Sequence, residues 1–155
     1  PDHPYGIAGL QQFEQLDHGS VVSGTHACLL AAIMGRSFAI YAARYPFEIH
    51  VAPLSPVPDL AALTPEQADA FPAISIEVMR RLDGVFGIAM AYIATWHQAP
   101  VREGRDLLRL HWQITSVRRA PGKLKYLAGS ESAMGAFIMD LKPEQSAGQL
   151  RDVVL

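Results

Sequence analysis

The feature that most constrains this chain is a strict alternation of apolar and polar residues over positions 108–115. The apolar positions are Leu108, Leu110, Trp112 and Ile114, and the polar positions are Arg109, His111, Gln113 and Thr115. Successive side chains of a β-strand point to opposite faces, so this pattern predicts a strand with one face in a core. Residues 47–51 alternate in the same way, and Glu48 and His50 are predicted to share a face and to pair. Two such strands are typical of an antiparallel sheet.

The other predicted strands are shorter or less regular. Residues 38–43, 90–97 and 123–127 each suit a strand. Residues 28–34 are apolar all round, which is compatible with either a helix or a buried strand.

Two helices are predicted from their starting residues. Thr64 followed by Pro65 and Gln67 forms a capping box before apolar residues at helical spacing, and Pro72 is expected to kink that helix. A last helix is predicted to begin at Pro143, with one apolar face formed by Ala147, Leu150 and Val154. Strands in sequential pairs with helices packed on them predict an α+β domain.

Composition excludes several classes of function. Half of the residues are hydrophobic and 18% are charged, so the chain can build a core. The net charge of −2 leaves no basic surplus for binding nucleic acid. The longest apolar run, residues 27–34, is too short to cross a bilayer and is a poor secretory signal. The single cysteine, Cys28, excludes an internal disulfide and a cysteine-based zinc site. We expect a cytoplasmic protein with a poorly defined segment, residues 1–24, before one domain, residues 25–155.

Four short segments resemble motifs of one family. They are residues 44–48 (RYPFE), 92–100 (YIATWHQAP), 110–113 (LHWQ) and 125–131 (KYLAGSE). Their order and spacing are similar to those of galactose-1-phosphate uridylyltransferases, which belong to the histidine-triad superfamily. The resemblance covers roughly residues 44–155 and implies a histidine-triad-like antiparallel sheet with packed helices.

The resemblance also implies what this chain lacks. The family enzymes contain two related halves, and the first half carries a His-Pro-His motif whose second histidine becomes uridylylated. None of the six histidines of this chain lies two residues from another. The chain therefore resembles the second half alone, with no catalytic residue of its own. It implies that a first-half polypeptide or a lost segment supplies the nucleophile, and it places the zinc that relatives often carry in that missing half.

The metal ligands of the second half are also replaced. In some relatives this half holds a metal through the histidine at position 97 and two more histidines, whose positions here are Thr115 and Val117. A metal site needs three or four ligands, so we predict no metal and a structural role for His97. The polar stripe of His111, Gln113 and Thr115 is compatible with either a solvated face or the lining of a cleft.

The resemblance assigns substrate binding to one loop. In the family homodimer, this loop enters the neighbouring active site and contacts the hexose and phosphates of the UDP-sugar. The matching residues here are Lys125, Tyr126, Ala128, Ser130, Glu131 and Phe137. Glu131 is suited to accept hydrogen bonds from sugar hydroxyls, and Lys125 to place a cation near phosphate. Ser130 and Phe137 depart from the tyrosine and glutamine of many relatives. Without the resemblance, Lys123 and Lys125, with Arg118 and Arg119, would be interpreted as a solvated basic turn, whereas the resemblance favours the substrate loop.

The leading interpretation is the C-terminal part of a uridylyltransferase that exchanges UMP between UDP-glucose and galactose 1-phosphate. One alternative is a non-catalytic sugar-nucleotide-binding or interaction module of the same fold. The other is a relative of the dinucleoside polyphosphate or ADP-sugar phosphorylases.

Overall fold

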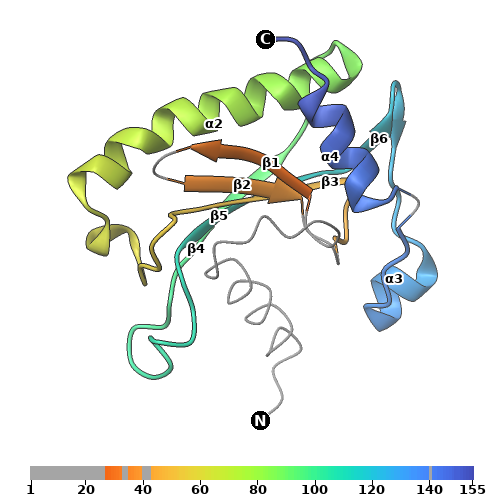
Figure 1. Ribbon diagram of the computed structural model, residues 1–155. Coiled ribbons are helices and arrows are strands. Elements are labelled where there is room, and N and C mark those ends of the chain that lie inside the picture. Colours follow the sequence, from red (N-terminus) through yellow and green to blue (C-terminus); the bar gives the residue numbers. More distant parts are fainter. Residues whose placement is uncertain (1–26, 33–34, 40–42, 140) are drawn as a thin grey trace.

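The computed structural model describes residues 27–32, 35–39, 43–139 and 141–155 of the chain (Figure 1). The predicted N-terminal segment, residues 1–24, and part of the predicted strand at 38–43 lie outside these residues.

A five-stranded antiparallel sheet forms the centre of the fold. Its strands are β1 (Ala27–Ala32), β2 (Gly35–Ala39), β3 (Phe47–Ala52), β4 (Ile93–His97) and β5 (His111–Ser116). They lie side by side in the order β1-β2-β3-β5-β4, and every neighbouring pair is antiparallel. The apolar segment that suited either a helix or a strand is therefore a strand. The two alternating segments form strands β3 and β5, as predicted, and they pair with each other in the middle of the sheet although β4 lies between them in the chain.

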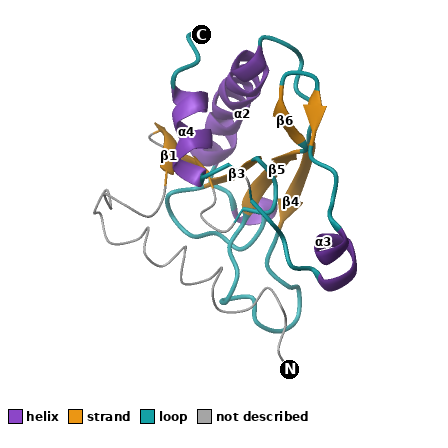
Figure 2. Cartoon of the chain, turned by 90° about the vertical axis from the view of Figure 1, so that its right-hand side faces the viewer, coloured by secondary structure: helices purple, strands orange, loops and turns teal. Residues whose placement is uncertain are grey.

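The helices and a small second sheet complete the fold. The long helix is α2 (Pro65–Phe86), and the last helix is α4 (Pro143–Arg151). Short elements are the 3-10 helix η1 (Leu60–Ala62), the hairpin of β6 (Arg118–Ala120) and β7 (Lys123–Leu124), and helix α3 (Gly129–Met134). Figures 1 and 2 show α2 and α4 on the same side of the sheet. No helix within the described residues is long and apolar enough to span a membrane.

Helix α2 begins as its sequence predicts. The Gln67 backbone N–H donates to Thr64 Oγ1 at 3.2 Å, and the Thr64 N–H donates to Gln67 Oε1 at 2.9 Å. These reciprocal bonds satisfy two donors that the first helical turn would otherwise leave unpaired. The helix continues through Pro72 and ends at Gly87, whose φ of +65° suits glycine.

The core lies between α2, α4 and the apolar face of the sheet. Its buried members are Phe47, Ile49, Val51, Ile74, Val78, Leu82, Met90, Ile114, Ala147 and Leu150. The residues of β3 and β5 among them are the apolar positions of the alternating segments. The prediction that Val154 shares the apolar face of the last helix is wrong, since α4 ends at Arg151 and Val154 is 95% exposed. The Arg81 guanidinium from α2 donates to the Leu150 and Arg151 carbonyls. It thereby provides hydrogen-bond donors for carbonyls that the end of α4 leaves unpaired within the helix.

Candidate functional site

The predicted substrate contacts, residues 125–137, lie in the segment that follows strand β7 and contains helix α3. The Lys125 N–H donates to the Val117 carbonyl at 2.6 Å. This bond fixes the residue after β7 beside the residue that connects β5 to β6. The Glu131 side chain accepts from the Ala128 N–H at 2.7 Å, which caps the start of α3. The helix ends at Gly135, whose φ is +65°. Residues 125–138 therefore form an ordered segment.

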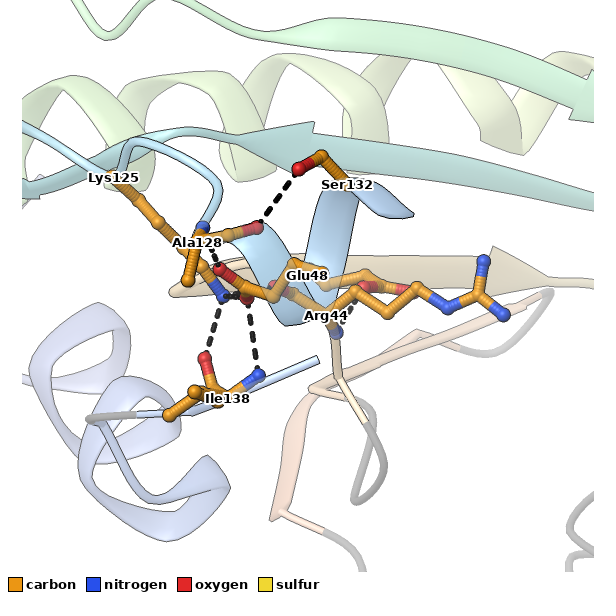
Figure 3. Close-up of polar contacts among 7 residues, drawn as sticks. Arg44, Glu48, Lys125, Ala128, Ser132 and Ile138 are labelled. Atoms are coloured by element: carbon orange, nitrogen blue, oxygen red, sulfur yellow. Dashed lines mark hydrogen bonds and ion pairs between the residues drawn. The ribbon is translucent and has the colours of Figure 1, made fainter. Parts of the chain in front are cut away.

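A buried ion pair lies at the centre of this segment. Lys125 Nζ lies 2.7 Å from Glu131 Oε1, and the side chains are only 5% and 2% exposed. The same ammonium donates to the Arg44 carbonyl at 2.8 Å and to the Ile138 carbonyl at 2.7 Å (Figure 3). An ammonium has three protons, and here each has an acceptor. The alternative interpretation as a solvated basic turn is therefore wrong for Lys125, which is buried.

The Glu131 carboxylate is nearly as fully bonded. Besides Lys125 and the Ala128 N–H, it accepts from the Ile138 N–H at 3.0 Å. These three bonds, led by that from Lys125, lower the pKa of Glu131 to about 2. A carboxylate has about four lone-pair positions, so one remains for a further donor. The pair joins the turn at Arg44, which is distant in sequence, to α3 and to the chain at Ile138, four residues beyond the end of α3.

The other predicted contacts lie around this pair with different exposures. Tyr126 is 83% exposed, Ala128 is also exposed, and Ser130 is half-buried. Phe137 is half-buried, with its ring 6.2 Å from that of Tyr45 and the Arg44 guanidinium 5.0 Å above it. Five large apolar side chains of this region are exposed: Leu124, Tyr126, Leu127, Met134 and Ile138. The structure therefore brings the predicted residues together as a buried pair inside an exposed, largely apolar surface.

Sequence reasoning missed a row of three histidines on the polar face of the sheet. The rings of His50 and His111 stack at 4.9 Å, and those of His111 and His97 at 4.8 Å. Burial is the main cause that lowers the pKa of His111 to about 4, and His50 and His97 add to it. His97 and His111 are direct partners in the β4–β5 register, so a correct strand pairing would have revealed this contact.

The polar face continues into a second buried carboxylate. Gln113 Nε2 donates to Glu48 Oε1 at 2.8 Å, and the Arg44 N–H donates to Glu48 Oε2 at 2.9 Å. Burial opposes ionisation of Glu48, but these bonds and His50, at 3.7 Å, outweigh it and lower its pKa. The predicted pairing of Glu48 with His50 is confirmed. This part of the face is not solvated, because Glu48 is only 7% exposed.

The described residues contain no group of three His, Cys, Asp or Glu side chains that could hold a metal ion. The lone pairs of imidazole nitrogens lie in the ring plane, so the parallel rings of the histidine row do not direct them to one ion.

Comparisons with known proteins agree with the motifs. No protein-family model matches the chain. It is 34% identical over 133 residues to a galactose-1-phosphate uridylyltransferase of Streptomyces lividans, covering 76% of this chain and 36% of that protein. It is 30% identical over 112 residues to the Thermotoga maritima enzyme, covering 71% of this chain and 35% of that protein. This chain thus spans about a third of the length of these curated relatives.

Solved structures agree as well. A uridylyltransferase structure matches with a TM-score of 0.75 at 30% identity, over 94% of this chain and 49% of that one. The fold is shared by an ADP-glucose phosphorylase of Arabidopsis thaliana, with a TM-score of 0.76 at 22% identity over 95% of this chain and 47% of that one. It is also shared by a zinc-bound histidine triad family protein of Mycobacterium smegmatis, with a TM-score of 0.58 at 12% identity over 97% of this chain and 94% of that one. The fold is therefore the predicted histidine-triad-like α+β domain. The predicted family is confirmed: this chain belongs to the galactose-1-phosphate uridylyltransferase family.

Proposed function

We propose that this chain is the C-terminal part of a galactose-1-phosphate uridylyltransferase, a cytoplasmic nucleotidyltransferase of galactose metabolism. Its substrates would be UDP-glucose or UDP-galactose and a hexose 1-phosphate. The observation that carries the proposal is 34% identity to such an enzyme over three quarters of the chain.

In this proposal, residues 125–137 recognise the hexose part of the UDP-sugar across a subunit boundary. Glu131 has one lone-pair position left, but its side chain is only 2% exposed, so it would accept a sugar hydroxyl after a shift of the segment on binding. Lys125 has no proton left for a phosphate, so it contributes its charge and fixes the segment in place. Tyr126, Ala128 and Ser130 offer the contact surface, and Phe137 packs beside Tyr45 and Arg44. The exposed apolar side chains of this region suit burial against a neighbouring subunit.

The nucleophile comes from elsewhere in the assembly. A first half, on a partner polypeptide or on a segment outside these 155 residues, would supply the histidine that carries the uridylyl group, and covalent catalysis would divide UMP transfer into two steps. The zinc of the family would belong to that half as well.

Reconstitution tests this proposal. The neighbouring coding sequence should encode a first half, and the two polypeptides together should convert UDP-glucose and galactose 1-phosphate to UDP-galactose and glucose 1-phosphate. This chain alone should show neither turnover nor a uridylyl adduct by intact-mass analysis. A stoichiometric adduct on the isolated chain would contradict the proposal.

Calorimetry on the reconstituted complex tests the segment itself. Tyr126→Ala should weaken UDP-glucose binding by about tenfold and leave UDP binding unchanged. Glu131→Gln should act in the same direction, because the amide keeps one acceptor but loses the charge. The matched control is Tyr92→Ala, since Tyr92 is 49% exposed but lies outside the segment. Equal weakening of UDP and UDP-glucose would show that the segment does not contact the hexose.

A second candidate is a non-catalytic sugar-nucleotide-binding module, which the absence of a His-x-His motif favours. In that case no first half would be encoded nearby, and UDP-glucose would bind this chain alone. Tighter binding of ADP-glucose than of UDP-glucose would instead indicate kinship with the phosphorylases.

A further inference from the structure

The backbone of Arg44 joins the polar face of the sheet to the segment of residues 125–138. Its N–H donates to Glu48 Oε2 at 2.9 Å, and its carbonyl accepts from Lys125 Nζ at 2.8 Å (Figure 3). The same ammonium lies 2.7 Å from Glu131 Oε1. Glu48 and Lys125 are both buried, so water does not readily replace these bonds. A continuous series of bonds therefore leads from strand β3 to the carboxylate of Glu131.

Glu48 is a rigid starting point for this series. It lies in β3 opposite Thr115 of β5, and both are inner strands of the sheet. Its second carboxylate oxygen, Oε1, accepts from Gln113 Nε2 of β5 at 2.8 Å. Both oxygens are thus bonded to other groups of the fold, which gives the carboxylate a defined orientation. The position of Arg44 is therefore set from the centre of the sheet.

The turn at Arg44 and Tyr45 contacts the segment at both of its ends. One end is Lys125, which donates to the Arg44 carbonyl. At the other end, the Phe137 ring lies 6.2 Å from the Tyr45 ring and 5.0 Å from the Arg44 guanidinium. Helix α3, between these ends, has six residues, and a helix of that length is not stable on its own. The segment therefore depends on this turn for its position.

We propose that Glu48 is a positioning residue for the segment that binds the hexose: it holds the turn at Arg44, and the turn holds the Lys125–Glu131 pair. The inference rests on the proposed function for its ligand, and Glu48 itself does not touch the sugar nucleotide. A segment that is already held binds more tightly than one that must be ordered, because ordering costs free energy on binding. Without the Glu48 acceptor the Arg44 N–H loses this partner, the turn moves, and hexose binding weakens.

Amide hydrogen exchange on the full chain tests whether Glu48 holds the segment. The reporters are the N–H groups of Ala128 and Ile138, which donate to the Glu131 carboxylate. Glu48→Leu removes the acceptor and should speed exchange of both reporters by about tenfold. Glu48→Gln should restore rates close to those of the wild type, because its amide oxygen still accepts from the Arg44 N–H.

Two controls separate this local effect from a loss of overall stability. The Val78 amide lies in the buried part of α2, and its exchange should not change in Glu48→Leu. The matched variant is Glu77→Leu, because Glu77 also accepts hydrogen bonds, from Arg81, but on α2, so it should leave the reporters unchanged. Equal acceleration of Val78 and the reporters in Glu48→Leu would show a purely structural role and overturn the proposal, as would reporters that do not respond.

A second variant covers the case in which Glu48→Leu does not fold. Glu48→Asp keeps the charge, but its carboxylate is one methylene group shorter and does not reach the Arg44 N–H. It should therefore speed the reporters while Glu48→Gln does not, which assigns the effect to geometry and not to charge. The opposite order of the two variants would overturn the proposal.

Calorimetry on the reconstituted complex tests the consequence for binding. Glu48→Leu should weaken UDP-glucose binding by about tenfold and leave UDP binding unchanged, and Glu48→Gln should bind both as the wild type does. Unchanged or equal effects on the two ligands would overturn the positioning role. A wild-type complex that binds no UDP-glucose would refute the proposed function instead, and the exchange rates would still decide whether Glu48 holds the segment.

Discussion

Two groups of buried polar side chains in this protein meet the cost of burial in different ways. The Lys125–Glu131 pair keeps both charges, because each is matched by the other and by backbone groups on every side. The histidine row of His50, His111 and His97 keeps His111 neutral, with its pKa lowered to about 4. A charge survives burial when its partners are complete, and otherwise the group gives up its charge. The pair should therefore be sensitive to loss of a partner, and the row to pH.

The largest effect should come from removing one partner of the pair. Lys125→Met leaves the Glu131 carboxylate buried without its cation, so the melting temperature should fall by on the order of 10 °C. Lys123→Met is the matched control, since Lys123 is exposed and should change the melting temperature little. The double variant Lys125→Met/Glu131→Leu should recover part of the loss. A single variant as stable as the wild type would show that the pair does not hold the segment in place.

The second effect concerns the histidine row. His111 has a usual pKa of 6.5 and a pKa of about 4 in the folded protein. As the pH falls, His111 takes up its proton in the unfolded chain before it does so in the folded protein. The contribution of His111 to the free energy of unfolding is therefore fully present above about pH 6.5 and is lost as the pH falls toward 4, by up to about 3 kcal/mol. Urea unfolding at pH 7 and pH 4.5 measures this loss. His111→Gln should remove most of the difference, whereas His97→Gln, at an exposed position, should retain it.

The Lys125–Glu131 pair should lose its contribution to stability at a lower pH than the histidine row does. The pKa of Glu131 falls from 4.5 to about 2, chiefly because of Lys125. Its contribution is present above about pH 4.5 and is lost as the pH falls through 2, which should lower the melting temperature by about 5 °C. Thermal unfolding between pH 5 and pH 2 should show this slope in the wild type and in His111→Gln. The same slope in Glu131→Gln would assign the low window to other carboxylates.

The two groups also differ in what the sequence could predict. Alternation predicted β3 and β5 and the face of each that joins the core, because period-two patterning reports on the faces of a sheet. It did not predict the burial of Glu48 on the other face, and it wrongly placed Leu108, which is 43% exposed and precedes β5. The histidine row required the register between β4 and β5, which local pattern does not specify. The burial of Lys125 was out of reach, because its acceptors come from Arg44 and Ile138, which lie far from it in the chain or beyond an unpredicted helix. That helix, α3, was missed because its six residues have no apolar period and its cap comes from the Glu131 side chain.

The smallest expected effect tests how α3 supports the pair. Gly135 ends the helix with a φ of +65°, a conformation that is unfavourable for residues with a Cβ atom, so Gly135→Ala should cost about 1 kcal/mol. Its N–H donates to the Glu131 carbonyl at 3.2 Å, so strain at this position reaches the residue that completes the pair. Gly129→Ala is the matched control in the same helix, because a Cβ atom there meets nothing within 4 Å and its φ is not positive. Urea unfolding at pH 7 should separate the two variants by about 1 kcal/mol. Greater destabilisation by Gly129→Ala than by Gly135→Ala would contradict this prediction. It would show that the start of α3, and not its left-handed end at Gly135, positions Glu131 beside Lys125.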